Sequence, residues 1–186
     1  MRIVAAALLA ASGSIICAEA EATAPVAAAD VCFTLAREDC GSFAVAAIDA
    51  ARQSLLIQAY NFTEPRIVAA IIAAHRRGVS VEVIVDKITA RQRGEGVDAV
   101  AAAGIPTFVD RTPRIAHNKV MVIDGETVLT GSFNWSVSAE RYNAENLLAV
   151  HSTVLARYYT ANFSRRRAAS VTYAPAATAP AQEDGE

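Results

Sequence analysis

The chain has 186 residues, with 17 basic and 19 acidic side chains and a formal net charge of −2. This length suits one domain with a sizeable hydrophobic core. The near-neutral balance excludes a strongly basic protein that binds nucleic acid through its overall charge, the class whose pI exceeds about 9.

The first twenty residues are typical of a secretory signal peptide. Arg2 gives a short positive start, Ile3 to Ala11 an apolar run, and Ala18-Glu19-Ala20 a cleavage site of small residues. The apolar run is too short to span a bilayer core of about 30 Å, which argues against a membrane anchor. We predict a signal peptide over residues 1–20, cleaved after Ala20 or, as second choice, after Ala22, and a periplasmic or secreted protein.

Two cysteines, Cys32 and Cys40, remain once the signal peptide is removed. In an oxidising compartment such a pair predicts a disulfide bond that closes a small loop. The histidines His75, His117 and His151 stand at spacings unrelated to the cysteines, so the sequence predicts no metal site and no cofactor.

Hydrophobic periodicity predicts alternating helices and strands. Pro65 at a first helical position and Gly78 as a stop delimit one helix, and the alternation from Val79 to Val85 predicts a strand. This strand–helix–strand succession favours parallel pairing with a right-handed crossover. The expected helices are 42–53, 65–77, 96–103 and 153–166, and the expected strands are 55–60, 79–85, 105–109 and 145–151, besides a hairpin within 115–134.

These elements predict an α/β fold with a mixed, mostly parallel sheet flanked by helices on both faces. The domain is expected over residues 21–167. The last segment, 168–186, is rich in Ala, Pro and Thr and ends in acidic residues, so we expect a disordered tail there.

The segment from Ile115 to Asn134 carries the strongest local signal. Two runs rich in Val, Ile and Thr flank Asp124-Gly125, a pair typical of a two-residue hairpin turn. With that turn, Lys119 faces Thr130. Because side chains two apart on a strand share a face, one side of the hairpin is expected to carry five polar residues: His117, Lys119, Thr130, Ser132 and Asn134.

This set of side chains suits phosphoryl transfer. A histidine, with a reference pKa of about 6.5, can act as a nucleophile or as an acid near neutral pH. Lys119 supplies a positive charge, and Ser132 and Asn134 supply donors that can hold charged oxygens. The residues alone make His117 the candidate for the attacking group.

The spacing His117-x-Lys119-x4-Asp124-x6-Gly131-Ser132-x-Asn134 resembles the signature of the phospholipase D superfamily, the HKD motif. The resemblance covers about Ser42 to Tyr159. Within it, Leu55 to Asp86 and Asn143 to Asn146 look like the small, single-motif, non-specific endonucleases that bacteria secrete to the periplasm. It implies a phospholipase D-like α-β-α sandwich and a reaction that needs no metal.

The resemblance also implies the catalytic set, which is His117, Lys119, Asn134, Glu145, Ser132 and Asp124. In the family a carboxylate at the position of Glu145 bonds the far ring nitrogen of the histidine. Asp124 belongs to the motif, but its place at the hairpin tip favours a turn and scaffold role.

In-line displacement at phosphorus needs a nucleophile and a leaving-group acid on opposite sides of the phosphoryl group. One imidazole cannot occupy both sides, and the chain contains one motif. We therefore expect a homodimer with a composite active site at its two-fold axis. One His117 would form a phosphohistidine while the other protonates the leaving oxygen.

Nucleic acid is the expected substrate, DNA first, with RNA left open. Basic residues suited to phosphate precede the motif, namely Lys87, Arg91, Arg93 and Arg114. Two alternatives stay open: hydrolysis of phospholipid head groups, for which the superfamily is named, and a non-catalytic module that grips phosphate backbones. No stable membrane insertion is expected.

Overall fold

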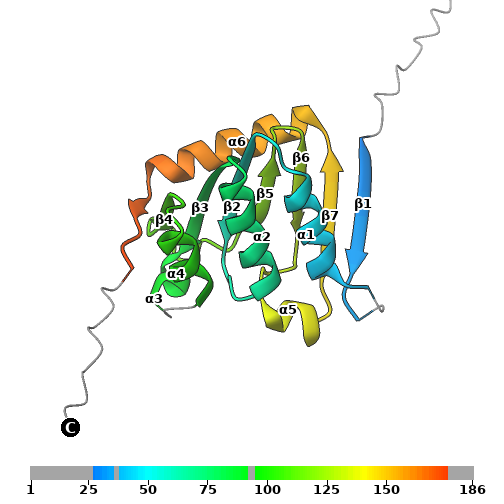
Figure 1. Ribbon diagram of the computed structural model, residues 1–186, viewed down its shortest axis with the longest axis horizontal. Coiled ribbons are helices and arrows are strands. Elements are labelled where there is room, and N and C mark those ends of the chain that lie inside the picture. The colour runs from blue at the N-terminus through cyan, green and yellow to red at the C-terminus, as the bar shows by residue number, and fades with distance from the viewer. Residues whose placement is uncertain (1–26, 36–37, 92–94, 176–186) are drawn as a thin grey trace, which may run out of the picture.

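The computed structural model describes residues 27–35, 38–91 and 95–175, where eight strands form one mixed sheet (Figure 1). The order across the sheet is β1-β7-β6-β5-β2-β3-β4-β8. The strands are β1 (Ala28–Phe33), β2 (Ser54–Ala59), β3 (Ser80–Asp86), β4 (Thr107–Asp110), β5 (Lys119–Ile123), β6 (Thr127–Gly131), β7 (Asn146–His151) and β8 (Val171–Thr172). The helices are α1 (Cys40–Ala50), α2 (Pro65–Arg76), α3 (Lys87–Arg91), α4 (Glu95–Ala102), α5 (Val137–Arg141) and α6 (Thr153–Ala168). The expected signal peptide, Arg93 and tail residues 176–186 lie outside the described residues.

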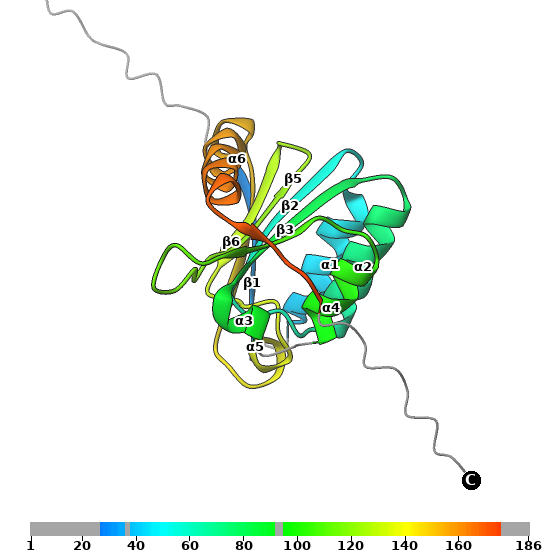
Figure 2. The ribbon, with the colours of Figure 1, turned by 90° about the vertical axis from the view of Figure 1, so that its left-hand side faces the viewer.

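The sheet separates two layers of helices (Figure 2). Helices α1, α2 and α4 cover one face, and α6 covers the other. The larger core, which includes Ile57 and Met121, lies on the first side, while Val120 and Val128 pack with Ala156 of α6. Successive residues of β5 point to opposite faces, so this strand is buried on both. The expected α/β architecture with helices on both faces is confirmed.

The expectation of a mostly parallel sheet is wrong. Only β2–β3 and β3–β4 pair in parallel, whereas the other five described pairs are antiparallel. After β4 the chain passes along the end of the sheet through residues 111–118 and returns as β5 beside β2. This connection contains no helix and is too short for a parallel crossover, so β5 runs antiparallel, and β6 and β7 follow as neighbours.

The β5–β6 hairpin is shifted by one residue from the expected register. Asp124-Gly125 has positive φ angles, 54° and 67°, as a two-residue turn requires, but Glu126 adds a residue before the ladder begins. Val120, not Lys119, therefore faces Thr130. Directly opposed residues share a face, so Thr130 points to the α6 side, away from Lys119. The expected polar face is wrong at Thr130.

Local signals set the ends of the first elements. Helix α1 begins at Cys40, two residues before the expected start at residue 42, because the carboxylate of Asp39 accepts the backbone N–H of Ser42 at 2.8 Å and caps the helix. Gly78, with a φ of 93°, follows α2 as expected. The predicted disulfide bond between Cys32 and Cys40 is confirmed, and it ties β1 to α1.

The two edge strands lie in segments for which the sequence predicts no strand. Strand β1 pairs with β7, and β8 pairs with β4. Strand β8 falls within the expected tail, where the Tyr173 hydroxyl also donates to Asp98 at 2.5 Å. Residues 168–175 thus belong to the fold, and the expectation of disorder is wrong for them.

Candidate active site

One end of the sheet brings the polar residues of the motif together. Strand β2 ends there, and β5 and β7 begin there, beside α5 (Figure 1). His117 lies two residues before β5, and Tyr60 directly follows β2. The His117 residue is exposed, and its ring meets the Tyr60 ring edge-on with centroids 4.3 Å apart. The imidazole is thus held on one side by an aromatic ring and is accessible to a substrate.

Lys119 lies buried behind His117, with 7% of its surface exposed. Its Nζ donates to the backbone carbonyl of His117 at 2.9 Å and lies 4.9 Å from the centroid of the Tyr60 ring. Burial lowers the pKa of Lys119 below its ordinary value, and the negative charge of Glu145 opposes that effect. An ammonium has three N–H donors. Only one of them has a hydrogen-bond acceptor in the described part of the chain, which leaves donors for a phosphoryl oxygen.

Close packing at the end of β6 explains the glycine of the motif. A Cβ on Gly131 would lie 2.3 Å from the carbonyl oxygen of Asn146, so a larger residue would push β6 and β7 apart. Ser132 is exposed, and its Oγ accepts the backbone N–H of Asn146 at 3.1 Å. Asn134 is half-buried, and its Oδ1 has no hydrogen-bond partner among the described residues. Ser132 is therefore engaged by β7, whereas Asn134 has unused hydrogen-bonding capacity.

Glu145 immediately precedes β7 and is half-buried. Its Oε1 accepts from Nδ2 of Asn143 at 3.0 Å. In the region that the structure describes, no hydrogen bond joins Glu145 to His117, although the expected role requires one. The effect of its charge on Lys119 places the carboxylate within electrostatic reach of the site. Catalytic hydrogen bonds commonly tighten only once substrate is bound.

Asp124 lies at the opposite end of β5, in the hairpin turn. Its carboxylate accepts three backbone N–H groups, those of Gln53 at 2.8 Å, Ser54 at 2.9 Å and Arg52 at 3.0 Å. Burial alone would raise the pKa of Asp124, but these hydrogen bonds outweigh it and lower the pKa below its ordinary value. The geometry favours the scaffold role, because the carboxylate fixes the segment that enters β2.

Three of the expected phosphate-binding residues, Lys87, Arg91 and Arg114, lie within the described part of the chain. Lys87 donates from Nζ to the carbonyl of Pro113 at 2.8 Å. Lys87 and Arg91 line a cavity of about 210 Å³ near β8, whereas His117 lines a separate cavity of about 390 Å³. Arg114 is exposed in the segment between β4 and β5.

Two buried acidic residues that support the site were not predicted. Asp86, at the end of β3, is fully buried, and its carboxylate accepts the N–H of Ala116 at 2.6 Å and of Ile88 at 2.7 Å. It therefore holds the residue before His117. Asp110, at the end of β4, accepts from Nε of Arg166 at 2.6 Å. The only sequence signal was an acidic residue at the end of an apolar strand.

Within residues 27–35, 38–91 and 95–175, no group of three or more His, Cys, Asp or Glu side chains is arranged to hold a metal ion. Nor does any helix in those ranges have both the length and the apolar character required to cross a membrane.

Comparison with known proteins identifies the family. The family described as "Cardiolipin synthase, PLD-like domain" matches residues 44–167. A phospholipase D of Rickettsia bellii is 38% identical over 137 residues, which cover 74% of this chain and 68% of that protein. The chain belongs to the phospholipase D superfamily. The superfamily includes phosphodiester hydrolases, and this chain is one of them.

Other phospholipase D relatives extend the likeness. A mitochondrial cardiolipin hydrolase of Xenopus laevis is 36% identical over 115 residues, which cover 62% of this chain and 55% of that protein. Among solved structures, the chain is similar to Nuc from Salmonella typhimurium, described as a phospholipase D family member. The TM-score is 0.75 at 32% identity, and the match covers 78% of this chain and 97% of Nuc. The mixed sheet with helices on both faces is therefore the phospholipase D fold.

Proposed function

We propose that this phospholipase D-like chain is a metal-independent endonuclease that cleaves DNA, and RNA as a second substrate, through a phosphohistidine on His117. The observation that carries the proposal is the exposed His117 beside the buried ammonium of Lys119, which donates to the His117 backbone carbonyl and packs with the imidazole around the ring of Tyr60. A nucleophile must reach phosphorus, and a nearby fixed cation must hold the charged oxygens.

The roles follow from position. His117 attacks phosphorus, while Lys119 and Asn134 hold the non-bridging oxygens with help from Ser132. Glu145 orients the imidazole once the phosphoryl group draws the site together. The single acceptor found for Lys119 within the described chain supports its assignment, because it leaves N–H donors for these oxygens. Asn134 would donate to them from its Nδ2.

The second imidazole comes from a second copy of the chain. In-line displacement needs a leaving-group acid opposite the nucleophile, and one His117 cannot serve both sides. An isologous homodimer would bring two copies of His117 face to face, so that one attacks and the other protonates the leaving oxygen. The exposure of His117 supports this arrangement, because a partner can reach the ring.

Substrate choice rests on two sets of likenesses. This chain has a single motif, and its match covers 97% of Nuc; this likeness supports nucleic acid as the substrate. The relatives named phospholipase D and mitochondrial cardiolipin hydrolase favour the alternative, hydrolysis of phospholipid head groups. An exported, periplasmic or secreted protein fits the segment 1–20 and the disulfide bond Cys32–Cys40.

The test is incubation of the purified protein with supercoiled plasmid in excess EDTA. Nicking by the wild type, loss of nicking in His117→Asn and retention in the matched control His75→Asn are expected. Retarded migration of plasmid without cleavage would replace the nuclease with a binding module. Release of head groups from phosphatidylcholine or cardiolipin vesicles without plasmid cleavage would establish the phospholipid alternative.

A further inference from the structure

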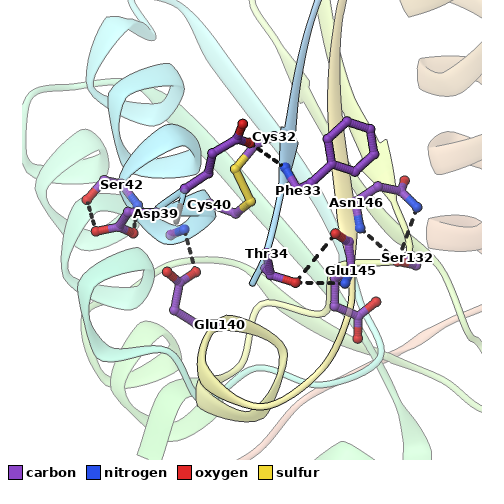
Figure 3. Close-up of a disulfide and its surroundings, with 12 residues drawn as sticks. Cys32, Phe33, Thr34, Asp39, Cys40, Ser42, Ser132, Glu140, Glu145 and Asn146 are labelled. Carbon is purple, nitrogen blue, oxygen red and sulfur yellow. Dashed lines mark hydrogen bonds between the residues drawn. A yellow bond between two sulfur atoms is a disulfide. The ribbon is translucent and has the colours of Figure 1, made fainter. Parts of the chain in front are cut away.

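The segment after β1 holds the start of β7 through one buried side chain. Thr34 is 5% exposed. Its Oγ accepts the backbone N–H of Glu145 at 2.7 Å (Figure 3). The same hydroxyl donates to the carbonyl of Asn143 at 2.6 Å. The N–H of Thr34 also donates to the carbonyl of Glu145 at 3.1 Å. Three hydrogen bonds from one residue thus fix the backbone turn that ends at Glu145.

This turn determines where the carboxylate of Glu145 lies. Figure 3 shows the Glu145 backbone facing Thr34 while the carboxylate points away from it. Asn143, whose carbonyl Thr34 holds, donates from its own Nδ2 to Glu145 Oε1 at 3.0 Å. Both the backbone and the side-chain contact of Glu145 therefore depend on the same threonine hydroxyl.

The disulfide bond anchors Thr34 in turn. Strand β1 is an edge strand in which Cys32 alone is buried. Cys32 is bonded to Cys40, a fully buried residue of α1. Because the rest of β1 buries little surface, its backbone ladder to β7 would be weakly held without this bond. The bridge lies two residues from Thr34.

We propose that Thr34 is a positioning residue for Glu145, and that the bridge Cys32–Cys40 keeps Thr34 in place. The proposal rests on the proposed function, in which Glu145 orients the reacting imidazole of His117. Without the threonine hydroxyl, the N–H of Glu145 and the carbonyl of Asn143 lose their buried partner, and the turn relaxes. The carboxylate then moves although every residue of the motif is intact.

The test compares two substitutions at one position, with bis(p-nitrophenyl) phosphate as a small phosphodiester probe. Thr34→Val removes the hydroxyl at nearly constant shape, and Thr34→Ser keeps it. We expect kcat to fall about 10- to 100-fold in Thr34→Val with KM within about twofold, as for other residues that orient a catalytic group, and Thr34→Ser to restore kcat. The double variant Cys32→Ala/Cys40→Ala should lower kcat in the same direction.

A double-mutant cycle separates positioning from general stability. In a Glu145→Gln background, Thr34→Val should cause no further loss of kcat. Equal losses in both backgrounds, or a lower melting temperature with unchanged kcat, would overturn the proposal. If His117→Asn keeps its activity, the proposed function itself fails. If His117→Asn is inactive and Glu145→Gln lowers kcat but Thr34→Val does not, only the positioning role fails.

Discussion

Replacing Asp124 by Asn tests whether this residue of the motif is a scaffold or a catalyst. Asparagine tolerates the left-handed backbone, with φ at 54°, and its Oδ1 can keep the bonds to Gln53 and Ser54. The substitution removes the charge and the second oxygen, which accepts from Arg52. Hydrogen bonds to a charged group contribute about 1.5–3 kcal/mol against about 0.5–1.5 for neutral ones. The turn is partly exposed, which reduces the expected loss of unfolding free energy to about 1–2 kcal/mol.

The assay is thermal unfolding of Asp124→Asn at pH 7 and at pH 3, with Glu126→Gln in the same turn as control. For a chain of this size the melting temperature should fall about 2–8 °C at pH 7 and remain unchanged in the control. The pKa of Asp124 is lowered in the folded protein. Its carboxylate therefore stabilises the fold fully at a pH above the pKa in the unfolded chain, and this stabilisation is lost as the pH falls through the pKa in the folded protein. The difference in melting temperature between the two proteins should therefore be smaller at pH 3 than at pH 7.

Activity completes the test. Six residues of largely extended chain lie between His117 and Asp124, a distance of roughly 20 Å. Hydrolysis per folded molecule should therefore be unchanged in Asp124→Asn. A variant with the wild-type melting temperature and no hydrolysis would refute the scaffold assignment.

Two further substitutions follow from buried charges. Lys119→Met should abolish hydrolysis yet melt at the wild-type temperature or up to about 3 °C above it, because burial disfavours the charged lysine. In the wild type this destabilisation by the buried charge is relieved only as the pH rises through the lowered pKa of Lys119, so marked destabilisation of the variant at pH 7 would contradict the prediction. Arg166→Leu removes the cation that pairs with the carboxylate of Asp110, which is 1% exposed, and should lower the free energy of unfolding in urea by about 3 kcal/mol. The control Arg165→Leu, at an exposed neighbouring position, should lower it by under about 0.5 kcal/mol, and equal effects would contradict the importance of the ion pair.

Elements with local signals could be predicted from the sequence. Helix α2 lies between Pro65 and Gly78, and β3 has Val at every second position, so neither depends on distant contacts for its recognition. Strand β1 gives no such signal, because it buries only Cys32 and exists through pairing with β7. The hairpin turn was also local, but its register depended on Glu126, which a two-residue turn does not reveal.

The residues of the site also fall into those with a local sequence signal and those that depend on distant contacts. The spacing of the motif was enough to indicate His117 and Lys119, because both lie on one short stretch of chain. The supporting residues act across the sequence, since Asp86 holds Ala116 from 30 residues away and Thr34 holds Glu145 from 111 residues away. Such pairs meet only through the strand order, which the sequence pattern did not establish.

Mixing active and inactive subunits tests the shared site most directly. Equal amounts of wild type and His117→Asn would be unfolded, mixed and refolded, and cleavage of a phosphodiester would be compared with that of the same total amount of refolded wild type. Random pairing produces about one quarter wild-type homodimers. A composite site with both imidazoles required predicts about one quarter of the wild-type activity. About one half would mean that each His117 works independently and would contradict the account.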